Sequence, residues 1–335
     1  MSEKERNYLF DNLKAFLITS TVFAHLLKQS PTFGPDNLGG HLYFIIFSYI
    51  MEGFILISGY FSKNTVKCRD GAVKNFLLPY IFFVLAVSII SMLICGRPRG
   101  NLIVPSFALW FMFAMFVFRV TVNITSKIPH IVPIALVMYF AAGCLPLNDT
   151  MTGSRICCFF LFYIIGYKME WKHFERIRSI GKGYILALAA VLTVVSVAVG
   201  RFGLFSEGLL YLKKPYANYG LSVPEGIVIR LVILVLFFGW LCVMVNLMPQ
   251  KKTFFSDIGR KTVTVYILHI AVRYLFMYTP AAGPGGALSY IIALLTAPAA
   301  VWLFSREPVF RAYNYIVDTI YRPVGFVWKK IRSGT

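Results

Sequence analysis

The sequence has few charged residues: they make up only 14% of its 335 positions, and just 14 of them are acidic. Hydrophobic residues make up 58%, and the mean hydropathy is +0.70. A soluble domain of this length is not normally so apolar. The composition therefore excludes an ordinary soluble globular protein. Apolar runs of about twenty residues recur along the chain, as expected for helices that cross a bilayer.

Several motifs that would assign a chemistry are missing. There is no P-loop, no dinucleotide-binding glycine pattern and no GxSxG nucleophile elbow. The five histidines are scattered, with no HExxH and no His/Cys pair at ligand spacing, so we expect no metal site. The six cysteines form no CxxC pair, and their expected role is that of small buried hydrophobic side chains. We also find no internal repeat, low-complexity tract or soluble domain.

The net charge of +19 would suggest a nucleic-acid partner if the protein were soluble. Here the basic residues lie mainly in short connections between apolar runs and in the tail, as membrane topology requires. We therefore expect membrane lipids, and no nucleic acid, as partners.

The apolar runs predict an all-α, polytopic transmembrane bundle of about ten spans. They fall near residues 8–27, 41–62, 74–95, 105–124, 130–147, 153–168, 183–200, 226–247, 262–279 and 285–305.

The distribution of Lys and Arg predicts that both termini are cytoplasmic. With Lys4 and Arg6 on the cytoplasmic side, the connections on that side carry most of the basic residues. Residues 1–305 then form the membrane domain. Residues 306–335 form a basic amphipathic tail suited to the anionic inner leaflet, and its basic residues are Arg306, Arg311, Arg322, Lys329, Lys330 and Arg332.

Two outer segments are longer than turns, namely Lys28–Gly40 and Arg201–Glu225. The second contains several aromatic residues, including Phe205 and Tyr211. Such rings either anchor the chain at the membrane interface or stack on a sugar ring.

The first span contains three ionisable residues on one stripe, Asp11, Lys14 and His25. Lys14 and His25 are eleven residues apart, which places them about 20° apart around a helix and about 16 Å apart along it. Ionisable residues inside a span are costly and usually functional, so we expect His25 to act in catalysis. Lys14 either has a role or extends to the interface, and Asp11 either assists or only neutralises Lys14.

Four polar residues in other spans also need an explanation. His269 shares a helical face with Tyr266, and its imidazole either packs between helices or joins an active cavity. Glu52 lies inside the second span, where a carboxyl group needs a partner or a proton. Arg119 either binds a phosphate or anchors to lipid headgroups.

The opening RNYLFDNLKAFLITSTVFAHL resembles the first helix of acyltransferase family 3, and more narrowly of the fucose 4-O-acetylase-like group. The signature of that family is a basic residue, ten residues, then His, which Lys14 and His25 fit. The resemblance continues, in family order, through FILISGYFSK, LLPYIFF, ALWFMFAMFVFR, FFLFYIIGY and IGRKTVTVYILH. The chain departs from the family at Ile50, Met51 and Glu52, where many members have His-Met-Pro.

The resemblance implies a multi-pass enzyme of the plasma or inner membrane that moves an acetyl group from acetyl-CoA to a hydroxyl of a glycan or glycolipid. His25 suits the chemistry as base or nucleophile. We assign His25 and Asp11 to catalysis and Lys14 and Arg119 to coenzyme A. Weaker candidates for the substrate cavity are Ser58, Tyr266, His269 and Glu52.

Two other functions stay open from the sequence. A transporter or flippase of a lipid-linked sugar would also use intramembrane charges, although the chain has no evident inverted repeat. A non-catalytic membrane sensing module on the same fold is the second alternative, and the departure at Glu52 keeps it open. The Lys14–His25 pair argues against such a module, which has no need of a costly imidazole.

Overall fold

A computed structural model describes residues 7–98, 100–105 and 107–333, with the side chains of Cys95 and of residues 327–333 left out. Every regular element in these ranges is helical, which confirms the all-α prediction. Lys4 and Arg6, and the side chains of Lys329, Lys330 and Arg332, lie outside the description. The part of the orientation prediction that depends on them is therefore not tested.

The helices follow the predicted spans closely. The span predicted at 8–27 is α1 (Leu9–Leu27), and the span predicted at 262–279 is α13 (Thr262–Tyr278). Seven helices are long and apolar enough to cross a membrane in the described part of the chain. The first helix is not among them because its polar residues lower its hydropathy. The count of ten spans and the cytoplasmic termini stay predictions.

The chain divides into two compact units, and we describe each by itself. The first contains the described residues up to Phe54, together with Met169–Tyr211 and Val228–Arg306. Its elements are α1, α2 (Leu38–Phe47), the start of α3 (Ile50–Tyr60), α9 (Trp171–Ser179), α10 (Lys182–Arg201), the short helix η4 (Glu207–Tyr211), most of α11 (Val223–Leu247), α12 (Ser256–Arg260), α13, η6 (Pro280–Ala282) and α14 (Gly286–Phe304).

The second unit contains the described parts of Ile55–Lys168, Leu212–Ile227 and the chain from Glu307 onward. Its elements are the rest of α3, α4 (Thr65–Ala72), the π-turn η1 (Val73–Leu77), α5 (Leu78–Cys95), η2 (Phe107–Leu109), α6 (Trp110–Thr125), α7 (Ile131–Ala141), η3 (Thr150–Thr152), α8 (Gly153–Lys168), η5 (Tyr216–Tyr219) and α15 (Glu307–Ser333).

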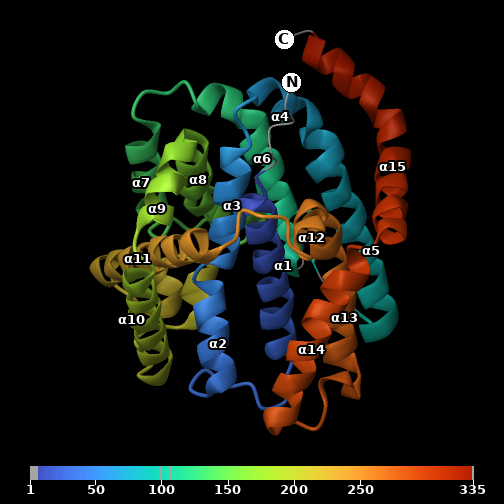
Figure 1. The fold of residues 1–335 in the computed structure, drawn as a ribbon. Helices are drawn as coiled ribbons and strands as arrows, with labels where there is room; N and C mark the ends of the chain where they lie inside the picture. Colours follow the sequence, from blue (N-terminus) through green and yellow to red (C-terminus); the bar gives the residue numbers. More distant parts are fainter. Residues whose placement is uncertain (1–6, 99, 106, 334–335) are drawn as a thin grey trace. The chain divides into compact units, whose positions relative to one another are not determined.

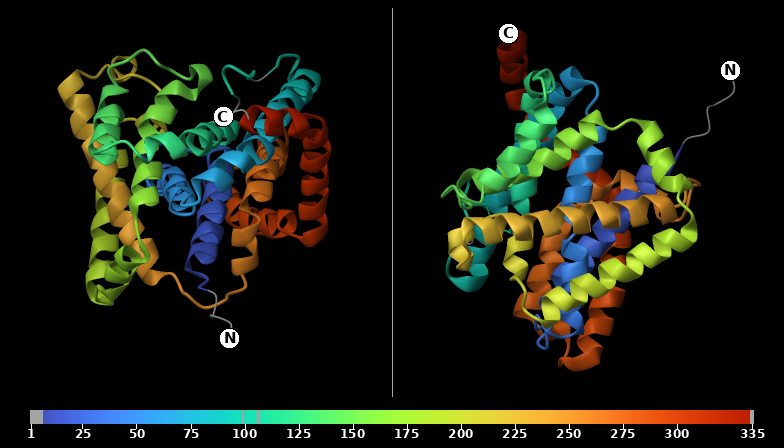
Figure 2. Two further views of the ribbon diagram at one scale, coloured as in Figure 1. Left: turned by 90° about the horizontal axis from the view of Figure 1, so that it is seen from above. Right: turned by 90° about the vertical axis from the view of Figure 1, so that its left-hand side faces the viewer.

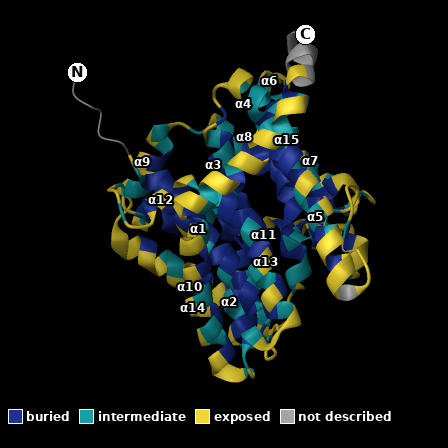
Figure 3. Ribbon diagram, turned by 90° about the vertical axis from the view of Figure 1, so that its right-hand side faces the viewer, coloured by how far each residue is buried: buried dark blue, intermediate teal, exposed yellow. Residues whose placement is uncertain are grey.

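Helix α1 lies at the centre of the first unit. It packs against α2, α12, α13 and α14, and Figure 1 shows it in dark blue beside the orange α13 and α14. Most of its residues are buried, and it appears largely dark blue in Figure 3. In contrast, α10 and α14 expose apolar side chains such as Val194 and Leu295, as expected for helices that face lipid. The unit therefore surrounds the polar stripe of α1 with other helices.

Two glycines let α3 and α8 cross closely in the second unit. A Cβ atom on Gly59 would lie 2.0 Å from the carbonyl oxygen of Tyr163, and one on Gly166 would lie 2.0 Å from that of Leu56. Small residues at such crossings allow membrane helices to approach each other. The segments FILISGYFSK and FFLFYIIGY, which are far apart in the sequence, thus form one helix pair.

Helix α15 packs along α5, and Figure 2 shows the red helix beside it. Tyr313 and Val317 are buried, and the ring of Tyr313 stacks on that of Phe83 with centroids 6.2 Å apart. Lys74 Nζ lies 2.5 Å from Asp318 Oδ1. One face of the tail thus contacts protein. The division into domains 1–305 and 306–335, and contact of the tail with lipid, stay predictions.

Candidate functional site

The N-terminal end of α1 contains an ion pair. Lys14 Nζ lies 3.0 Å from Asp11 Oδ1, and the side chains are 23% and 8% exposed. Asp11 precedes His25 by fourteen residues, which is about 21 Å along the helix. The geometry therefore makes Asp11 the counter-ion of Lys14, while its catalytic role stays a prediction.

A hydrogen-bonded clamp holds this end of α1. The Asn12 side chain donates to the carbonyl oxygens of Pro249 and Lys251 at 2.8 and 3.0 Å. Its oxygen accepts from Thr253 Oγ1 at 2.7 Å and from Ser256 Oγ at 2.6 Å. All the hydrogen-bonding capacity of this buried amide is used. Sequence reasoning missed Asn12, although it lies between the two flagged residues Asp11 and Lys14.

The other end of α1 brings two imidazoles together. The ring of His25 stacks on that of His269, with centroids 5.4 Å apart and planes 16° apart. The ring of Phe47 makes a T-shaped contact with that of His25, with centroids 5.5 Å apart. His269 is buried, whereas His25 is partly exposed. The ring of His25 thus contacts side chains from two other helices inside the first unit.

The protonation pattern of neutral His269 follows from its neighbours. Its Nδ1 lies 2.5 Å from the carbonyl oxygen of Tyr266. A carbonyl oxygen only accepts hydrogen bonds, so Nδ1 carries the proton and Nε2 carries the lone pair. The Tyr266 ring lies 5.5 Å from that of His269. Two weaker sequence candidates, Tyr266 and His269, thus come together with His25.

A charged and aromatic cluster lies one helical turn beyond His25. Lys28 Nζ donates to Tyr211 OH at 2.8 Å and forms an ion pair with Glu207. The hydroxyls of Tyr43 and Tyr211 lie 2.7 Å apart. The sequence flagged Tyr211 only as one of several outer aromatic residues. The sequence could have placed Lys28 near His25, because residues three apart share a helix face.

Glu52 lies at the start of α3 and is 1% exposed. Within the described chain, neither carboxyl oxygen has a hydrogen-bond partner. Its role in a substrate cavity stays a prediction. A buried polar group left unsatisfied costs about 1–3 kcal/mol of stability.

We therefore expect Glu52→Leu to stabilise the folded protein by about 1–3 kcal/mol, because leucine has no polar atoms to desolvate. The measurement is the midpoint of thermal unfolding in detergent. Glu52→Gln is the matched control, since it keeps a polar group there and should gain little. A lower midpoint for the leucine variant than for the wild type would mean that Glu52 makes a stabilising interaction.

Arg119 and Ser58 belong to the second unit. The Arg119 guanidinium lies 4.8 Å from the centroid of the Phe76 ring, and no described residue accepts a hydrogen bond from its buried Nε. Ser58 accepts a hydrogen bond from Ser62 Oγ at its backbone oxygen, at 2.7 Å. Arg119 thus has the chemistry to bind an anion, but its predicted contact with coenzyme A is not tested.

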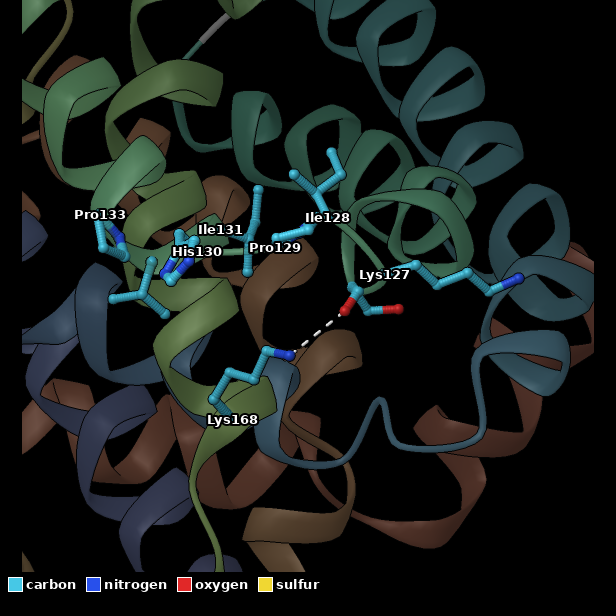
Figure 4. Close-up of a pocket in the computed structure, with 9 residues that line it drawn as sticks. Lys127, Ile128, Pro129, His130, Ile131, Pro133 and Lys168 are labelled. Carbon is cyan, nitrogen blue, oxygen red and sulfur yellow. Dashed lines mark hydrogen bonds between the residues drawn. The ribbon is translucent and has the colours of Figure 1, made fainter.

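A pocket of about 330 Å³ lies in the second unit, between the 126–133 connection and Lys168 (Figure 4). Lys168 Nζ donates to the carbonyl oxygen of Ser126 at 3.3 Å. The side chain of Lys127 extends away from Lys168 in Figure 4. The pocket therefore offers few cations to a phosphate, and we do not assign it to coenzyme A.

The first unit therefore presents an ion pair at one end of α1, and at the other end the His25 imidazole stacked on that of His269 from α13. An imidazole can accept a proton from a hydroxyl group or carry an acyl group. No group of three or more His, Cys, Asp and Glu side chains that could hold a metal ion occurs in the described ranges.

Comparison with known proteins gives one match. Residues 7–306 match the model of the acyltransferase domain family, acyltransferase family 3. No match was found among curated proteins or among solved structures. The matched region covers α1, with both of its polar ends, and also α13. The multiple apolar helices and this match indicate a membrane acyltransferase, and the chain belongs to acyltransferase family 3.

Proposed function

We propose that the protein is an O-acetyltransferase that moves the acetyl group of cytosolic acetyl-CoA to a hydroxyl of a cell-surface glycan or a lipid-linked sugar. We place it in the plasma or inner membrane, in the fucose 4-O-acetylase-like group of its family. The observation that carries the proposal is the contact between His25 and His269, at the opposite end of α1 from Lys14.

The length of α1 suits coenzyme A as the donor. Lys14 and His25 are about 16 Å apart along the helix, which is comparable to the reach of an extended pantetheine arm. Lys14 offers an ammonium group to the phosphates. The thioester would then lie beside the imidazole of His25.

The reaction follows from the two imidazoles. His25 takes the proton of the acceptor hydroxyl, and the oxygen attacks the carbonyl carbon of the thioester. The new C–O bond forms, the C–S bond breaks, and the coenzyme A thiolate leaves and receives a proton. His269 holds the ring of His25 by stacking, and its own ring is fixed by Tyr266. General-base catalysis of this kind contributes about 10²–10⁴-fold to a rate.

Mass spectrometry of cell-surface glycans tests this function. Cells that express the gene should carry acetylated sugars that are missing from cells without it. Restoring the wild-type gene should restore the acetyl groups. Glycans with identical acetylation in both cells, together with a change in the amount of lipid-linked sugar at the surface, would instead support a transporter.

Lys14 gives a separate prediction about the donor. Loss of a charged hydrogen bond costs about 1.5–3 kcal/mol, so Lys14→Met should raise the KM for acetyl-CoA about ten- to hundredfold and change kcat less. Lys14→Arg keeps the cation and is the matched control. The methionine leaves the buried Asp11 without its cation, which could destabilise the fold. The double variant Lys14→Met with Asp11→Asn removes that charge as well, so a raised KM in the double variant reports binding and not folding. A wild-type KM in Lys14→Met would exclude this role.

A further inference from the structure

The segment η4 is fastened to the His25 end of α1 by several contacts. Lys28, the residue after α1, forms an ion pair with Glu207 and donates to Tyr211 OH at 2.8 Å. Its ammonium also lies 4.8 Å from the centroid of the Tyr43 ring and 5.4 Å from that of Tyr211. Lys28 and Glu207 are 179 residues apart in the sequence, so these contacts fix a long-range approach of the chain.

These contacts continue to His25 through the ring of Phe47. Phe47, whose ring makes the T-shaped contact with that of His25, stacks on Tyr43 with centroids 4.1 Å apart. The ring of Tyr211 meets Phe47 with centroids 5.4 Å apart. A continuous path of side-chain contacts thus runs from the Lys28–Glu207 ion pair to the imidazole.

The neighbours of Lys28 favour its charged form. Burial alone would lower the pKa of Lys28, but Tyr211 and Glu207 more than offset this effect, and its pKa is raised above the ordinary value. Burial and the charge of Glu207 also raise the pKa of the Tyr211 hydroxyl, although Lys28 opposes them. Lys28 therefore stays charged and the Tyr211 hydroxyl stays neutral.

We propose that the Lys28–Glu207 ion pair and the Tyr43–Tyr211 hydrogen bond latch residues 207–211 over His25, and that this latch keeps water from the acyl group until an acceptor binds. Lys28 thereby determines whether a sugar hydroxyl or water receives the acetyl group. This inference rests on the proposed function. An active site that excludes water prevents hydrolysis of a reactive intermediate, and closing segments commonly do this.

The reaction that the latch would prevent is hydrolysis of acetyl-CoA, which needs no reactant other than water. His25 takes a proton from water, and the water oxygen attacks the thioester carbonyl carbon. The C–S bond breaks, and acetate and the free thiol of coenzyme A are released. The rate of thiol release from acetyl-CoA alone therefore reports how well the latch is closed.

The test uses the purified full chain in lipid vesicles, with acetyl-CoA as the only substrate. Loss of a charged hydrogen bond should open the latch, so we expect Lys28→Met and Glu207→Gln each to raise thiol release about ten- to hundredfold. The exchange variant, Lys28→Glu with Glu207→Lys, should return release toward the wild-type rate because it restores the ion pair. Lys214→Met, which changes an exposed lysine of the same outer segment, should match the wild type.

Tyr211→Phe is a milder probe, because it keeps the ring and removes only the hydroxyl. It should raise thiol release in the same direction, by a smaller factor than Lys28→Met. Suppose that Lys28→Met, Glu207→Gln and Tyr211→Phe all release thiol at the wild-type rate and still transfer acetyl groups to a glycan fraction. That result would overturn the latch but not the proposed function. A wild-type protein that releases no thiol even with that glycan fraction would instead contradict the proposed function.

Discussion

Replacing His25 by alanine should abolish acetyl transfer. Of the two stacked imidazoles, that of His269 is fixed by the carbonyl oxygen of Tyr266, and we expect the imidazole of His25 to act on the substrate. Loss of a general base lowers a rate by about 10²–10⁴-fold, and loss of a nucleophile would leave no covalent route. The measurement is acetyl incorporation into glycans by membranes that contain equal amounts of each variant.

Two controls separate chemistry from folding. His130→Asn changes an exposed histidine in the second unit, at a left-handed backbone position that asparagine tolerates. It should leave both activity and thermal stability near the wild-type values. For His25→Ala itself, an unchanged unfolding midpoint and retained acetyl-CoA binding would show that the fold is intact. Wild-type transfer by a folded His25→Ala protein would exclude His25 from the reaction.

Gly259→Ala should cause the largest loss of stability. A Cβ atom at this position would lie 1.8 Å from the carbonyl oxygen of Asp11 and 2.5 Å from its carbonyl carbon. These are backbone atoms and cannot rotate away, so α12 and the start of α1 must separate. Overpacking of a core costs about 1–3 kcal/mol, and we expect a loss at or above the upper end. The midpoint of thermal unfolding measures it.

The same substitution should also weaken acetyl-CoA binding. Separation of α12 from α1 would pull Ser256 away from Asn12 and move the Lys14 end of the helix. Gly183→Ala is the matched control, because a Cβ atom on Gly183 would meet no atom within 4 Å. That variant should be as stable as the wild type or slightly more so, since alanine favours helix. A Gly259→Ala protein with wild-type stability would mean that this helix contact is not tight.

The helices themselves were largely predictable from the sequence. The span predicted at 183–200 is α10 (Lys182–Arg201), and the span predicted at 285–305 is α14 (Gly286–Phe304). Length and hydropathy are local properties, so a window along the chain detects them. The span predicted at 41–62 is found as Leu38–Tyr60, with a two-residue break between α2 and α3 that hydropathy did not indicate. The span predicted at 130–147 is only the shorter α7.

Only part of the site was predictable. The stripe of Asp11, Lys14 and His25 follows from helical spacing on one element. The stacking of His269 on His25 joins α13 to α1, and no pattern within either helix requires it. The Asn12 clamp and the Lys28 latch likewise depend on segments far away in the sequence. Their amide, hydroxyl and ammonium groups look ordinary until the fold brings their partners close.

The most direct test is acetyl transfer by the purified protein. The protein is placed in lipid vesicles with radiolabelled acetyl-CoA and a glycan fraction from cells that lack the gene. We expect label to enter the glycans together with release of an equal amount of coenzyme A thiol, in the wild type and not in His25→Ala. Thiol release and labelling that are absent from the wild type, or equal in both proteins, would contradict acyl transfer at His25.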